Sequence, residues 1–479
     1  MTRRLRALVS FAQAAAVGSV SVSVLVLPAG PARAAAGARP AAGEIASLSC
    51  ASAGACTAVG FRGAVPIRFR PLVVSEKNGV WGSVGTVGGS SALPGGVQGV
   101  RLGTVSCSSA GNCGAGGAYD QPAGFNLREQ GLVVTERGGA WGKAMAVPDL
   151  AALNAGHDAS VGLMSCRSAG SCTAAGRYTA GGDRAQVFVV SEKDGTWGQA
   201  EPIPGLALPG RSGAFASALS CGSPGDCTIG GDYATRTGTD AFAATQTDGT
   251  WSPVQTFPAI AAISKFASID TLSCQPDGDC TGTGTYRAGG RQHVFAVSRT
   301  AGTWGAPALI PGSDALPGAA GDILSCPSPG NCTVSGGYFS KHGLRPFVAT
   351  EKNGTWGQAG PLPGIAALNA GPQVHLNGLV CFPAGACTAA GDYLIQHKKH
   401  TVAAIFVTAE KNGTWGKPLR MPGSLVNLGT NIDLTALSCG APGDCSAGGT
   451  YGPYAVLPFL VTQKNGTWGK ARPARGIRH

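Results

Sequence analysis

The chain has 479 residues, and only 13% of them are charged, while 43% are hydrophobic. This balance excludes a disordered chain, because disorder requires low hydrophobicity and high net charge. The 76 Gly and 31 Pro favour a fold rich in tight turns, and the net charge of +11 is mild for this length.

The first residues predict an export signal. A basic start, Arg3 to Arg6, precedes a long apolar run, and a small-x-small pattern ends at Ala34. We expect cleavage after Ala34 or Ala36, so that residues 1–36 are a signal peptide and its cleavage region. An uncleaved anchor is the alternative, because the apolar run is long for a signal. No later stretch is long and apolar enough to span a bilayer.

Removal of this segment lowers the net charge. Residues 1–34 carry four Arg and no acidic residue, so the mature chain has 11 − 4 = +7. That excess fits loose attraction to anionic glycans or cell-wall polymers, and it does not call for nucleic acid.

The remaining chain, 37–479, is predicted to be a single repetitive domain. Its sixteen cysteines form eight C-x5-C pairs, and the first cysteines of successive pairs are 52 to 59 residues apart. Each repeat has one Trp, and seven of the eight Tyr follow the second Cys by six residues. The repeats begin near residues 45, 102, 161, 216, 269, 321, 376 and 434.

Each repeat is predicted to contain four short strands. In the third repeat, the first strand ends at Cys166, "CTAAGRY" forms the second strand from Cys172, and "VFVVSEK" forms the third. An Asp194-Gly195 turn, a strong hairpin signal, then leads to the fourth strand with Trp197. The Gly two residues before each second Cys is expected to have positive φ.

A Gly inside the second strand recurs in all eight repeats. A Gly within a strand marks a bulge or a close backbone approach. The positions are Gly60, Gly117, Gly176, Gly231, Gly284, Gly336, Gly391 and Gly449. Small residues in the first two strands would let eight sheets crowd around one axis. We therefore predict an all-β, eight-bladed β-propeller of four-stranded antiparallel blades, in which no blade is shared between the two chain ends.

The two cysteines of each pair flank a short hairpin, so one disulfide per blade is expected. The chain-entropy model assigns about 2.4 kcal/mol to each such loop. Metal binding is the alternative, but the spacing lacks C-x2-C and no His recurs beside it. The predicted pairs are Cys50–Cys56, Cys107–Cys113, Cys166–Cys172, Cys221–Cys227, Cys274–Cys280, Cys326–Cys332, Cys381–Cys387 and Cys439–Cys445.

The turn before each Trp carries a family resemblance. "SEKDGTW" at 191–197 and "TQTDGTW" at 245–251 resemble the Asp-box (BNR) and photosystem II assembly-factor type of propeller repeat. Most copies have Asn in place of Asp, the fifth has Ala301, and the spacing is one residue short. The units resemble still more closely the Cys-paired repeats of secreted proteins from high-GC bacteria. The resemblance implies architecture, because its motifs are structural.

Candidate catalytic and metal sites are weak. Sialidases share the Asp-box propeller, and the resemblance would imply an Arg cluster, a Tyr nucleophile with a Glu partner and an acid Asp. Here the Tyr are repeat positions, and the Arg show no convergence. The recurring Glu of "SEK", such as Glu192, is interpreted as a solvated strand residue. Asp277 and Asp279 hint at calcium, but other repeats lack them, and we expect no metal and no cofactor.

A basic cluster is the candidate binding site. The connections after the second and fourth strands are predicted to be much longer than the other turns and to vary between repeats. Strand alternation places both at one end of the ring, the long-loop face, where binding loops tend to lie. The cluster comprises His397, Lys398, Lys399 and His400 of the seventh repeat, with Arg62, Arg68 and Arg70 in the equivalent loop of the first. The bland alternative is an exposed solubilising loop.

These observations lead to a functional expectation. We expect a secreted, extracellular or cell-surface-associated monomer that binds a glycan, a cell-wall polymer or a protein on its long-loop face, without catalysis. The alternative is a carbohydrate-active hydrolase or lyase with its site at the channel mouth. Two or three converging carboxylates there would favour that enzyme, whereas an apolar or basic rim would favour binding. A purely structural envelope protein predicts neither feature.

Overall fold

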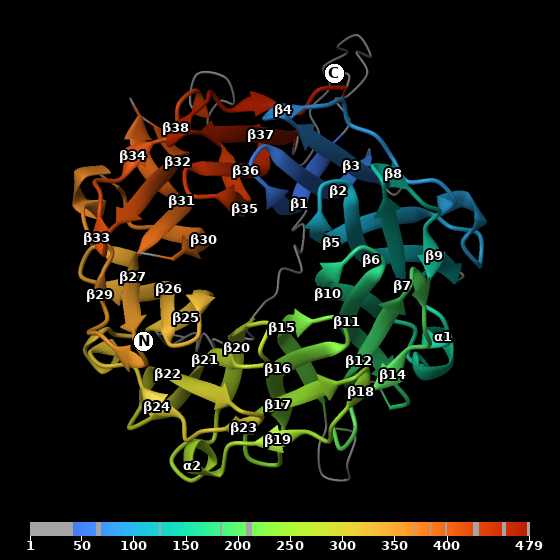
Figure 1. Ribbon diagram of the computed structural model, residues 1–479, viewed down its shortest axis with the longest axis horizontal. Helices are drawn as coiled ribbons and strands as arrows, with labels where there is room; N and C mark the ends of the chain where they lie inside the picture. The colour runs from blue at the N-terminus through green and yellow to red at the C-terminus, as the bar shows by residue number, and fades with distance from the viewer. Residues whose placement is uncertain are drawn as a thin grey trace, which may run out of the picture. The chain divides into compact units, whose positions relative to one another are not determined.

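Eight sheets follow one another along the chain and stand as blades around a central opening (Figure 1), which confirms the predicted eight-bladed β-propeller. The computed structural model describes residues 42–63, 69–123, 126–182, 184–206, 213–368, 370–383, 385–397, 400–424, 431–452 and 457–476. The predicted signal region, 1–36, lies outside the described residues. Among the described residues, no helix is long and apolar enough to cross a bilayer.

Each blade is built from consecutive strands, numbered from the innermost outward. The innermost strands are β1 (Ala42–Ser52), β5 (Gly99–Ser109), β10 (Ala159–Ser168), β15 (Ala214–Ser223), β20 (Ala267–Cys274), β25 (Ala320–Ser328), β30 (Val374–Phe382) and β35 (Ile432–Ala441). The second strands are β2 (Ala55–Gly63), β6 (Asn112–Ala123), β11 (Ser171–Ala180), β16 (Asp226–Ala234), β21 (Cys280–Ala288), β26 (Asn331–Ser340), β31 (Ala386–His397) and β36 (Asp444–Tyr451). The third strands are β3 (Arg70–Lys77), β7 (Asn126–Arg137), β12 (Arg184–Lys193), β17 (Thr239–Thr247), β22 (Arg291–Thr300), β27 (Gly343–Lys352), β32 (His400–Lys411) and β37 (Leu457–Lys464).

The outermost strand carries the Trp and is interrupted. Its first part is β4 (Val80–Trp81), β8 (Ala140–Trp141), β13 (Thr196–Trp197), β18 (Thr250–Trp251), β23 (Thr303–Trp304), β28 (Thr355–Trp356), β33 (Thr414–Trp415) and β38 (Thr467–Trp468). Its second part, in blades 2 to 8, is β9 (Met145–Ala146), β14 (Glu201–Pro202), β19 (Gln255–Thr256), β24 (Ala308–Leu309), β29 (Gly360–Pro361), β34 (Leu419–Arg420) and β39 (Arg472–Pro473). Both parts pair with the third strand of their blade.

Short helical turns lie in the connections to the next blade. They are α1 (Leu150–Leu153), α2 (Pro258–Ala261) and the 3₁₀ turns Ser90–Ala92, Ser313–Ala315 and Ile365–Leu368.

All eight predicted disulfides are present, one in each blade, and no cysteine is free. The Cα atoms of each pair are 3.8 to 4.1 Å apart. In blade 1, for example, Cys50 and Cys56 are direct cross-strand partners at the end of the β1–β2 hairpin.

The recurring Gly of the second strand sits opposite a β-bulge in the innermost strand. In blade 1 the register shifts between Ile45 and Ser47, which leaves Ala46 as the extra residue. A Cβ on Gly60 would lie only 1.8 Å from the carbonyl oxygen of Glu44. On the third strand, a buried Leu or Phe lies opposite the Gly and covers it, as Phe188 covers Gly176 in blade 3. The bulge and the covering side chain together explain why only Gly occupies this position.

Neighbouring blades are joined through the Ser that directly precedes the first Cys of each blade. The Cys107 backbone N–H donates to Ser49 Oγ of the preceding blade at 2.9 Å. The same bond closes the ring, because Cys50 N–H donates to Ser438 Oγ of blade 8, also at 2.9 Å. Blades 1 and 8 are each built from their own consecutive strands, so the expectation that no blade is shared is confirmed.

The turn before the outermost strand pairs with the disulfide hairpin. In blade 1, Asn78 and Gly79 both have positive φ, 52° and 76°, as a tight two-residue hairpin requires. Gly79 N–H donates to the carbonyl oxygen of Gly54, whose own φ is 66°, at 3.0 Å. The predicted positive φ of this loop Gly is therefore confirmed, and the contact ties the two short turns of the blade together.

Candidate functional site

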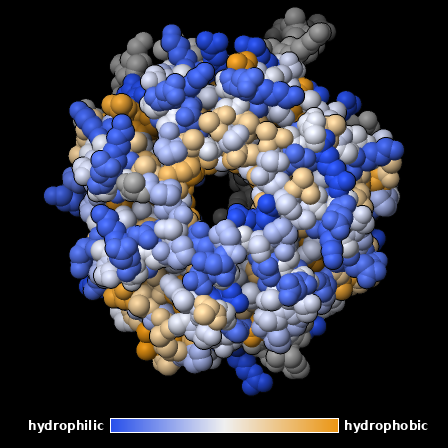
Figure 2. Space-filling view, viewed as in Figure 1, coloured by the Kyte–Doolittle hydropathy of each residue, from blue (hydrophilic) through white to orange (hydrophobic). Residues whose placement is uncertain are grey.

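The repeated frame carries different residues at one level of its innermost strands, which border the opening in the ring (Figures 1 and 2). This level lies toward the end of each strand that is remote from the disulfide. We call the residues six positions before the first Cys, together with the bulge residues and their neighbours on the second strand, the channel-mouth ring. The first set is Glu44, Arg101, Ser160, Phe215, Ser268, Ala320, His375 and Asp433. The bulge residues are Ala46, Gly103, Gly162, Ser217, Asp270, Asp322, Asn377 and Thr435.

Blades 4 to 6 contribute three carboxyl groups, which we call the acidic sector. Asp270 and Asp322 are bulge residues of β20 and β25, and Asp232 lies on β16 opposite Phe215. Phe215 is 49% exposed, so the sector combines carboxyl groups with an accessible aromatic ring. The chain thus brings together residues that are separated by one repeat each.

Burial raises the pKa of every carboxyl group in the acidic sector. The pKa of Asp270 rises to about 7, and the negative charges of Asp322 and Asp232 add to the effect of desolvation, while hydroxyl donors such as Ser268 oppose it. Desolvation raises the pKa of Asp232 and of Asp322 to about 6 each. Asp322 is accessible to solvent, yet protein surrounds its carboxyl group closely enough to disfavour the charge. The cluster therefore holds protons near neutral pH and can both donate and accept them.

A second group of titratable residues lies in blades 7, 8 and 1. Burial, together with the charge of Asp433, raises the pKa of Asp392 to about 7. Asn377 donates to Asp392 Oδ1 at 2.9 Å and to the Leu434 carbonyl at 2.7 Å, which links blades 7 and 8. Burial lowers the pKa of His375, although nearby Asp433 opposes the shift.

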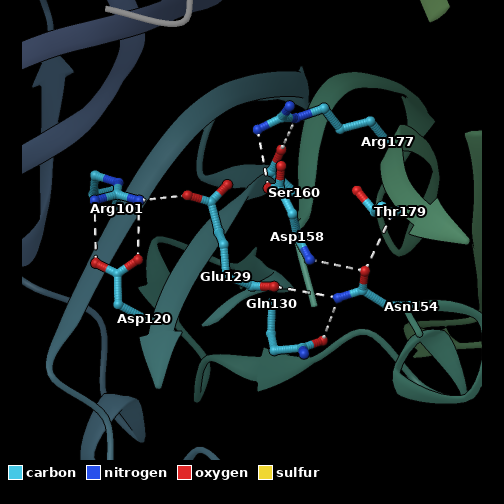
Figure 3. Close-up of polar contacts among 9 residues, drawn as sticks. All are labelled: Arg101, Asp120, Glu129, Gln130, Asn154, Asp158, Ser160, Arg177 and Thr179. Carbon is cyan, nitrogen blue, oxygen red and sulfur yellow. Dashed lines mark hydrogen bonds and ion pairs between the residues drawn. The ribbon is translucent and has the colours of Figure 1, made fainter. Parts of the chain in front are cut away.

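In blades 2 and 3 the charged groups are paired (Figure 3). Arg101 makes two hydrogen bonds of 3.1 Å to the Asp120 carboxylate and one of 2.7 Å to Glu129. Arg177 pairs with Asp158 at 3.1 Å. Arg101 is therefore held by two carboxylates, whereas Arg177 pairs with Asp158 alone and 43% of its side chain is exposed.

A buried amide supports this paired sector (Figure 3). Asn154, after helix α1, donates to Gln130 Oε1 at 3.2 Å and accepts the backbone N–H groups of Asp158 and Thr179. The amide fixes the strand ends that position Glu129 and Asp158, and this side of the mouth is a rigid structural network.

The predicted basic cluster lies partly outside the described residues, which do not include Arg68, Lys398 and Lys399. Arg62 of β2 and Arg70 of β3 are direct cross-strand neighbours in the backbone register. His397 and His400 are likewise opposite each other at the ends of β31 and β32. These four residues were expected in a loop, but the strands extend farther than the sequence indicates.

The prediction of long connections after the second strand is wrong in several blades. In blade 6, only Lys341 and His342 separate β26 from β27, because both strands continue to the end of the hairpin. In blade 7 the same holds for β31 and β32. The segments that differ in length between repeats are therefore partly extensions of the second and third strands. Residues that were expected in loops lie on these paired strands.

The interpretation of the "SEK" glutamates as solvated residues is also wrong. Glu76, Glu136, Glu192, Glu351 and Glu410 are only 2% to 4% exposed. Burial raises the pKa of each of these carboxyl groups. The carboxyl group points into the seam between two blades because the third strand alternates its faces, and this position falls on the packed face.

Hydroxyl groups of the preceding blade satisfy some of these carboxylates. Glu76 accepts Ser446 Oγ at 2.8 Å and also Thr462 Oγ1, which in turn accepts Trp81 Nε1. Glu192 accepts Thr135 Oγ1 at 2.7 Å. In contrast, Oε2 of Glu136, Glu192, Glu351 and Glu410 has no partner in the described chain. The hydrogen-bonded group of buried Glu, hydroxyls and Trp therefore joins neighbouring blades. Both carboxylate oxygens of Glu76 are satisfied, whereas one oxygen of each of the other four glutamates has no partner among the described residues.

Glu351→Gln tests this assignment. Desolvation alone raises the pKa of Glu351, so its ionisation destabilises the fold as pH rises through the folded pKa. We expect Glu351→Gln to raise the melting temperature at pH 8 and to leave it unchanged at about pH 3, where the carboxyl group is protonated in both states. Gln246 and Gln463 occupy the equivalent position in blades 4 and 8, so the variant fits the frame. An equal effect at both pH values in a thermal melt would contradict this explanation.

The two residues considered for calcium binding, Asp277 and Asp279, have structural roles instead. Asp279 Oδ1 accepts the Ala301 backbone N–H at 3.0 Å, and Asp277 Oδ1 accepts the Asp279 N–H at 3.0 Å. Both carboxylates stabilise turns. Within the described ranges, no group of three or more His, Cys, Asp or Glu side chains could hold a metal ion.

Sequence reasoning missed the acidic sector, although a signal was present. Aligning the eight repeats on their first Cys places Asp270 and Asp322 where other repeats have Ala, Gly, Ser, Asn or Thr. An acidic residue at a position that the frame leaves small marks an individual feature of that blade. The convergence of Asp232 with them requires the ring and cannot be read from one repeat.

No protein-family model matches the chain, and no curated protein matches it. Similar solved structures include a Hadza microbial sialidase, with 10% identity over 74% of both chains and a TM-score of 0.37. Another is a PL25 polysaccharide lyase, an ulvan lyase, with 10% identity over 89% of this chain and 96% of that one and a TM-score of 0.44. A third is a neuraminidase-like protein of subtype N11 from a flat-faced bat virus, with 10% identity over 64% of this chain and 89% of that one and a TM-score of 0.38. At these identities the likeness is one of fold.

Proposed function

We propose that the protein is an extracellular carbohydrate-recognition module that binds a saccharide chain at the channel mouth. Eight disulfides and the signal-like N-terminus support an oxidising location. The observation that carries the proposal is the acidic sector. Carboxyl groups of Asp232, Asp270 and Asp322 can accept sugar hydroxyls, and exposed Phe215 can cover the apolar face of a sugar ring.

The acidic sector costs stability, which favours a functional role. Three neighbouring carboxyl groups with raised pKa values are less favourable at neutral pH than amides or small residues would be. Such arrangements concentrate at functional sites, where binding or catalysis requires them. The repeat shows that the frame itself does not need them, because Ala46 and Gly162 occupy the same bulge position in blades 1 and 3.

The charge of the mouth bears on the ligand. Acidic side chains outnumber the paired Arg101 and Arg177, so a neutral saccharide suits this surface better than an anionic one. An anionic glycan or cell-wall polymer suits instead the basic cluster of Arg62, Arg68, Arg70 and residues 397–400, which stays part of the proposal as a separate outer contact.

Hydrolysis is the second candidate function. Three carboxyl groups converge at the channel mouth, which is the arrangement expected of a carbohydrate-active enzyme, and their raised pKa values also favour it. Near pH 6.5, the raised pKa of Asp270, about 7, leaves that carboxyl group largely protonated, while Asp232 or Asp322 is partly ionised. A proton donor beside an ionised carboxylate is the pair that glycoside hydrolysis uses. In that reaction Asp270 would protonate the departing glycosidic oxygen, and its neighbour would activate water or attack the sugar carbon.

A glycan and cell-wall polysaccharide screen tests the proposal, with a reducing-end assay in parallel. The variants are Asp232→Asn/Asp270→Asn/Asp322→Asn for the mouth and Lys398→Glu/Lys399→Glu for the basic cluster. We expect a neutral glycan to bind the wild type and to lose at least tenfold in affinity in the triple Asn variant. Release of reducing ends by the wild type alone would favour hydrolysis over binding.

Two results would contradict the proposal. One is a wild-type protein that binds no glycan in the screen, and the other is binding that the triple Asn variant retains. Binding to anionic polymer that Lys398→Glu/Lys399→Glu leaves unchanged would remove the basic cluster from the proposal but would not affect the mouth.

A further inference from the structure

The seam between blades 6 and 7 contains an open pocket of about 470 Å³ at the outer rim of the ring. Its walls include Trp356 and Trp415 from β28 and β33, and Glu410 and Lys352 from β32 and β27 (Figure 1 locates β27 and β33). The volume falls within the range of small-molecule sites, roughly 300 to 1,000 Å³. This pocket is remote from the channel mouth, because it lies on the outermost strands.

Glu136, Glu192, Glu351 and Glu410 all have an unpartnered Oε2 in the described chain, and Glu410 is the one of the four that lies in the wall of this pocket. Glu410 is 3% exposed. Burying an acceptor without a donor costs about 1–3 kcal/mol, and more when the group is charged. A hydrogen-bond donor that entered the pocket would compensate this cost.

The seam between blades 8 and 1 shows what Glu410 lacks. There, Ser446 and Thr462 donate to both oxygens of the equivalent Glu76. In blade 6 the residues at those positions are Thr333 and Thr350, whose hydroxyl groups lie 3.4 Å apart, much as those of Ser446 and Thr462 lie 3.3 Å apart. The same frame therefore satisfies both carboxylate oxygens in one seam, whereas Glu410 Oε2 has no donor among the described residues in the other.

The charges of the pocket indicate a neutral ligand. Lys352 lies close enough to Glu410 to oppose the effect of burial on the Glu410 pKa. A cationic ligand would be repelled by Lys352, and an anionic ligand by Glu410. Two half-buried indole rings provide apolar faces, and Thr355 and Gln358 add polar groups at the edge.

We propose that this pocket binds one neutral monosaccharide unit of a glycan, with a sugar hydroxyl donating to Glu410, another oxygen accepting from Lys352, and the ring lying against Trp356 or Trp415. The site is additional to the channel mouth and does not depend on it. It would give the propeller a second carbohydrate contact on its rim.

The seam between blades 4 and 5 supplies a natural control. Its pocket of about 360 Å³ has the same position and also contains a Trp, Trp251. Arg299 stands there in place of Glu410, and Thr247 in place of Lys352. This second pocket is smaller, has one Trp in its wall where the first has two, and lacks the carboxylate acceptor, so we expect it to bind no neutral sugar.

The experiment measures binding of glucose, galactose, mannose, fucose, rhamnose and N-acetylglucosamine to the purified, oxidised protein by saturation-transfer difference NMR. We expect at least one sugar to bind, with an affinity reduced at least tenfold in Glu410→Gln and lost in Trp415→Ala. Glu410→Gln tests the site even if Trp415→Ala fails to fold, because Gln246 and Gln463 occupy this position naturally. Trp251→Ala and the triple Asn variant of the mouth should bind as the wild type does.

Several outcomes would overturn the inference. They are no binding of any of these sugars to the wild type, unchanged affinity in Glu410→Gln, or equal loss in Trp251→Ala. Stronger binding of protonated glucosamine than of N-acetylglucosamine would also overturn it, because the pocket would then select a cation. Loss of binding only in the triple Asn variant would place the sugar at the channel mouth and remove the rim site.

Discussion

Gly60→Ala is expected to destabilise the protein by more than about 3 kcal/mol or to prevent folding. The added Cβ would lie 1.8 Å from the carbonyl oxygen and 2.9 Å from the carbonyl carbon of Glu44. Both are backbone atoms, so the β1–β2 pair would have to separate at the bulge. This pair lies in blade 1, whose inner strand closes the ring against blade 8 through Ser438. Thermal and urea unfolding of the secreted variant measure the loss.

Gly162→Ala is the matched control for Gly60→Ala. Gly162 occupies the bulge position of blade 3, a Cβ there would meet nothing within 4 Å, and Ala46 stands at the same position in blade 1. We expect Gly162→Ala to melt within a degree or two of the wild type, about the effect of an ordinary surface substitution. If both variants unfolded at the wild-type temperature, close packing at the bulge would not explain the recurring Gly.

The second large effect is a loss of stability with rising pH. The pKa of Asp270 rises from 3.8 to about 7 in the folded protein, and those of Asp232 and Asp322 rise from 3.8 to about 6. A raised folded pKa means that the native state holds the proton more tightly than the unfolded state does. Its stabilising effect is therefore complete only below about pH 3, falls as pH rises above the unfolded pKa of 3.8, and is lost as pH rises through 6 to 7.

Asp232→Asn/Asp270→Asn/Asp322→Asn should remove much of this pH dependence. We expect the triple variant to melt about 2 to 5 °C above the wild type at pH 7.5 and at about the same temperature at pH 3. Asp194→Asn is the control, because it changes an exposed turn residue to the Asn that Asn353 and Asn412 provide in other blades. A triple variant less stable than the wild type at pH 7.5 would show that the carboxylates stabilise the fold.

Much of the fold could be predicted from the sequence because its determinants are local and repeated. The C-x5-C pair, the Gly before the second Cys and the two-residue turn before the Trp each act within one hairpin. The first two recur in all eight repeats, and the turn is Asn-Gly in four of them. The Gly of "CTAAGRY" predicted a bulge or a close approach, and Gly176 has both. Closure without a shared blade also followed, because each repeat contains all four strands.

The features that the sequence analysis mispredicted or missed depend on contacts between blades. Glu76 and Glu410 look like surface residues, since each begins a charged pair before a turn, and only the neighbouring blade buries them. The acidic sector was missed for the same reason. Asp232 and Asp270 are 38 residues apart in sequence, Asp270 and Asp322 are 52 apart, and the three come together only in the ring. The sequence of one repeat is enough to predict one blade, whereas the seams and the channel mouth are formed by residues of adjacent blades.

The most direct test of the account is a titration of the aspartate carboxyl groups by ¹³C NMR from pH 3 to pH 9. The central claim is that the inner strands of blades 5 and 6, together with the second strand of blade 4, hold a carboxyl cluster that keeps a proton near neutrality. The account predicts a carboxyl signal with a midpoint between about 6 and 7 that disappears in Asp270→Asn. A protein in which every aspartate titrates below about pH 5 would contradict it.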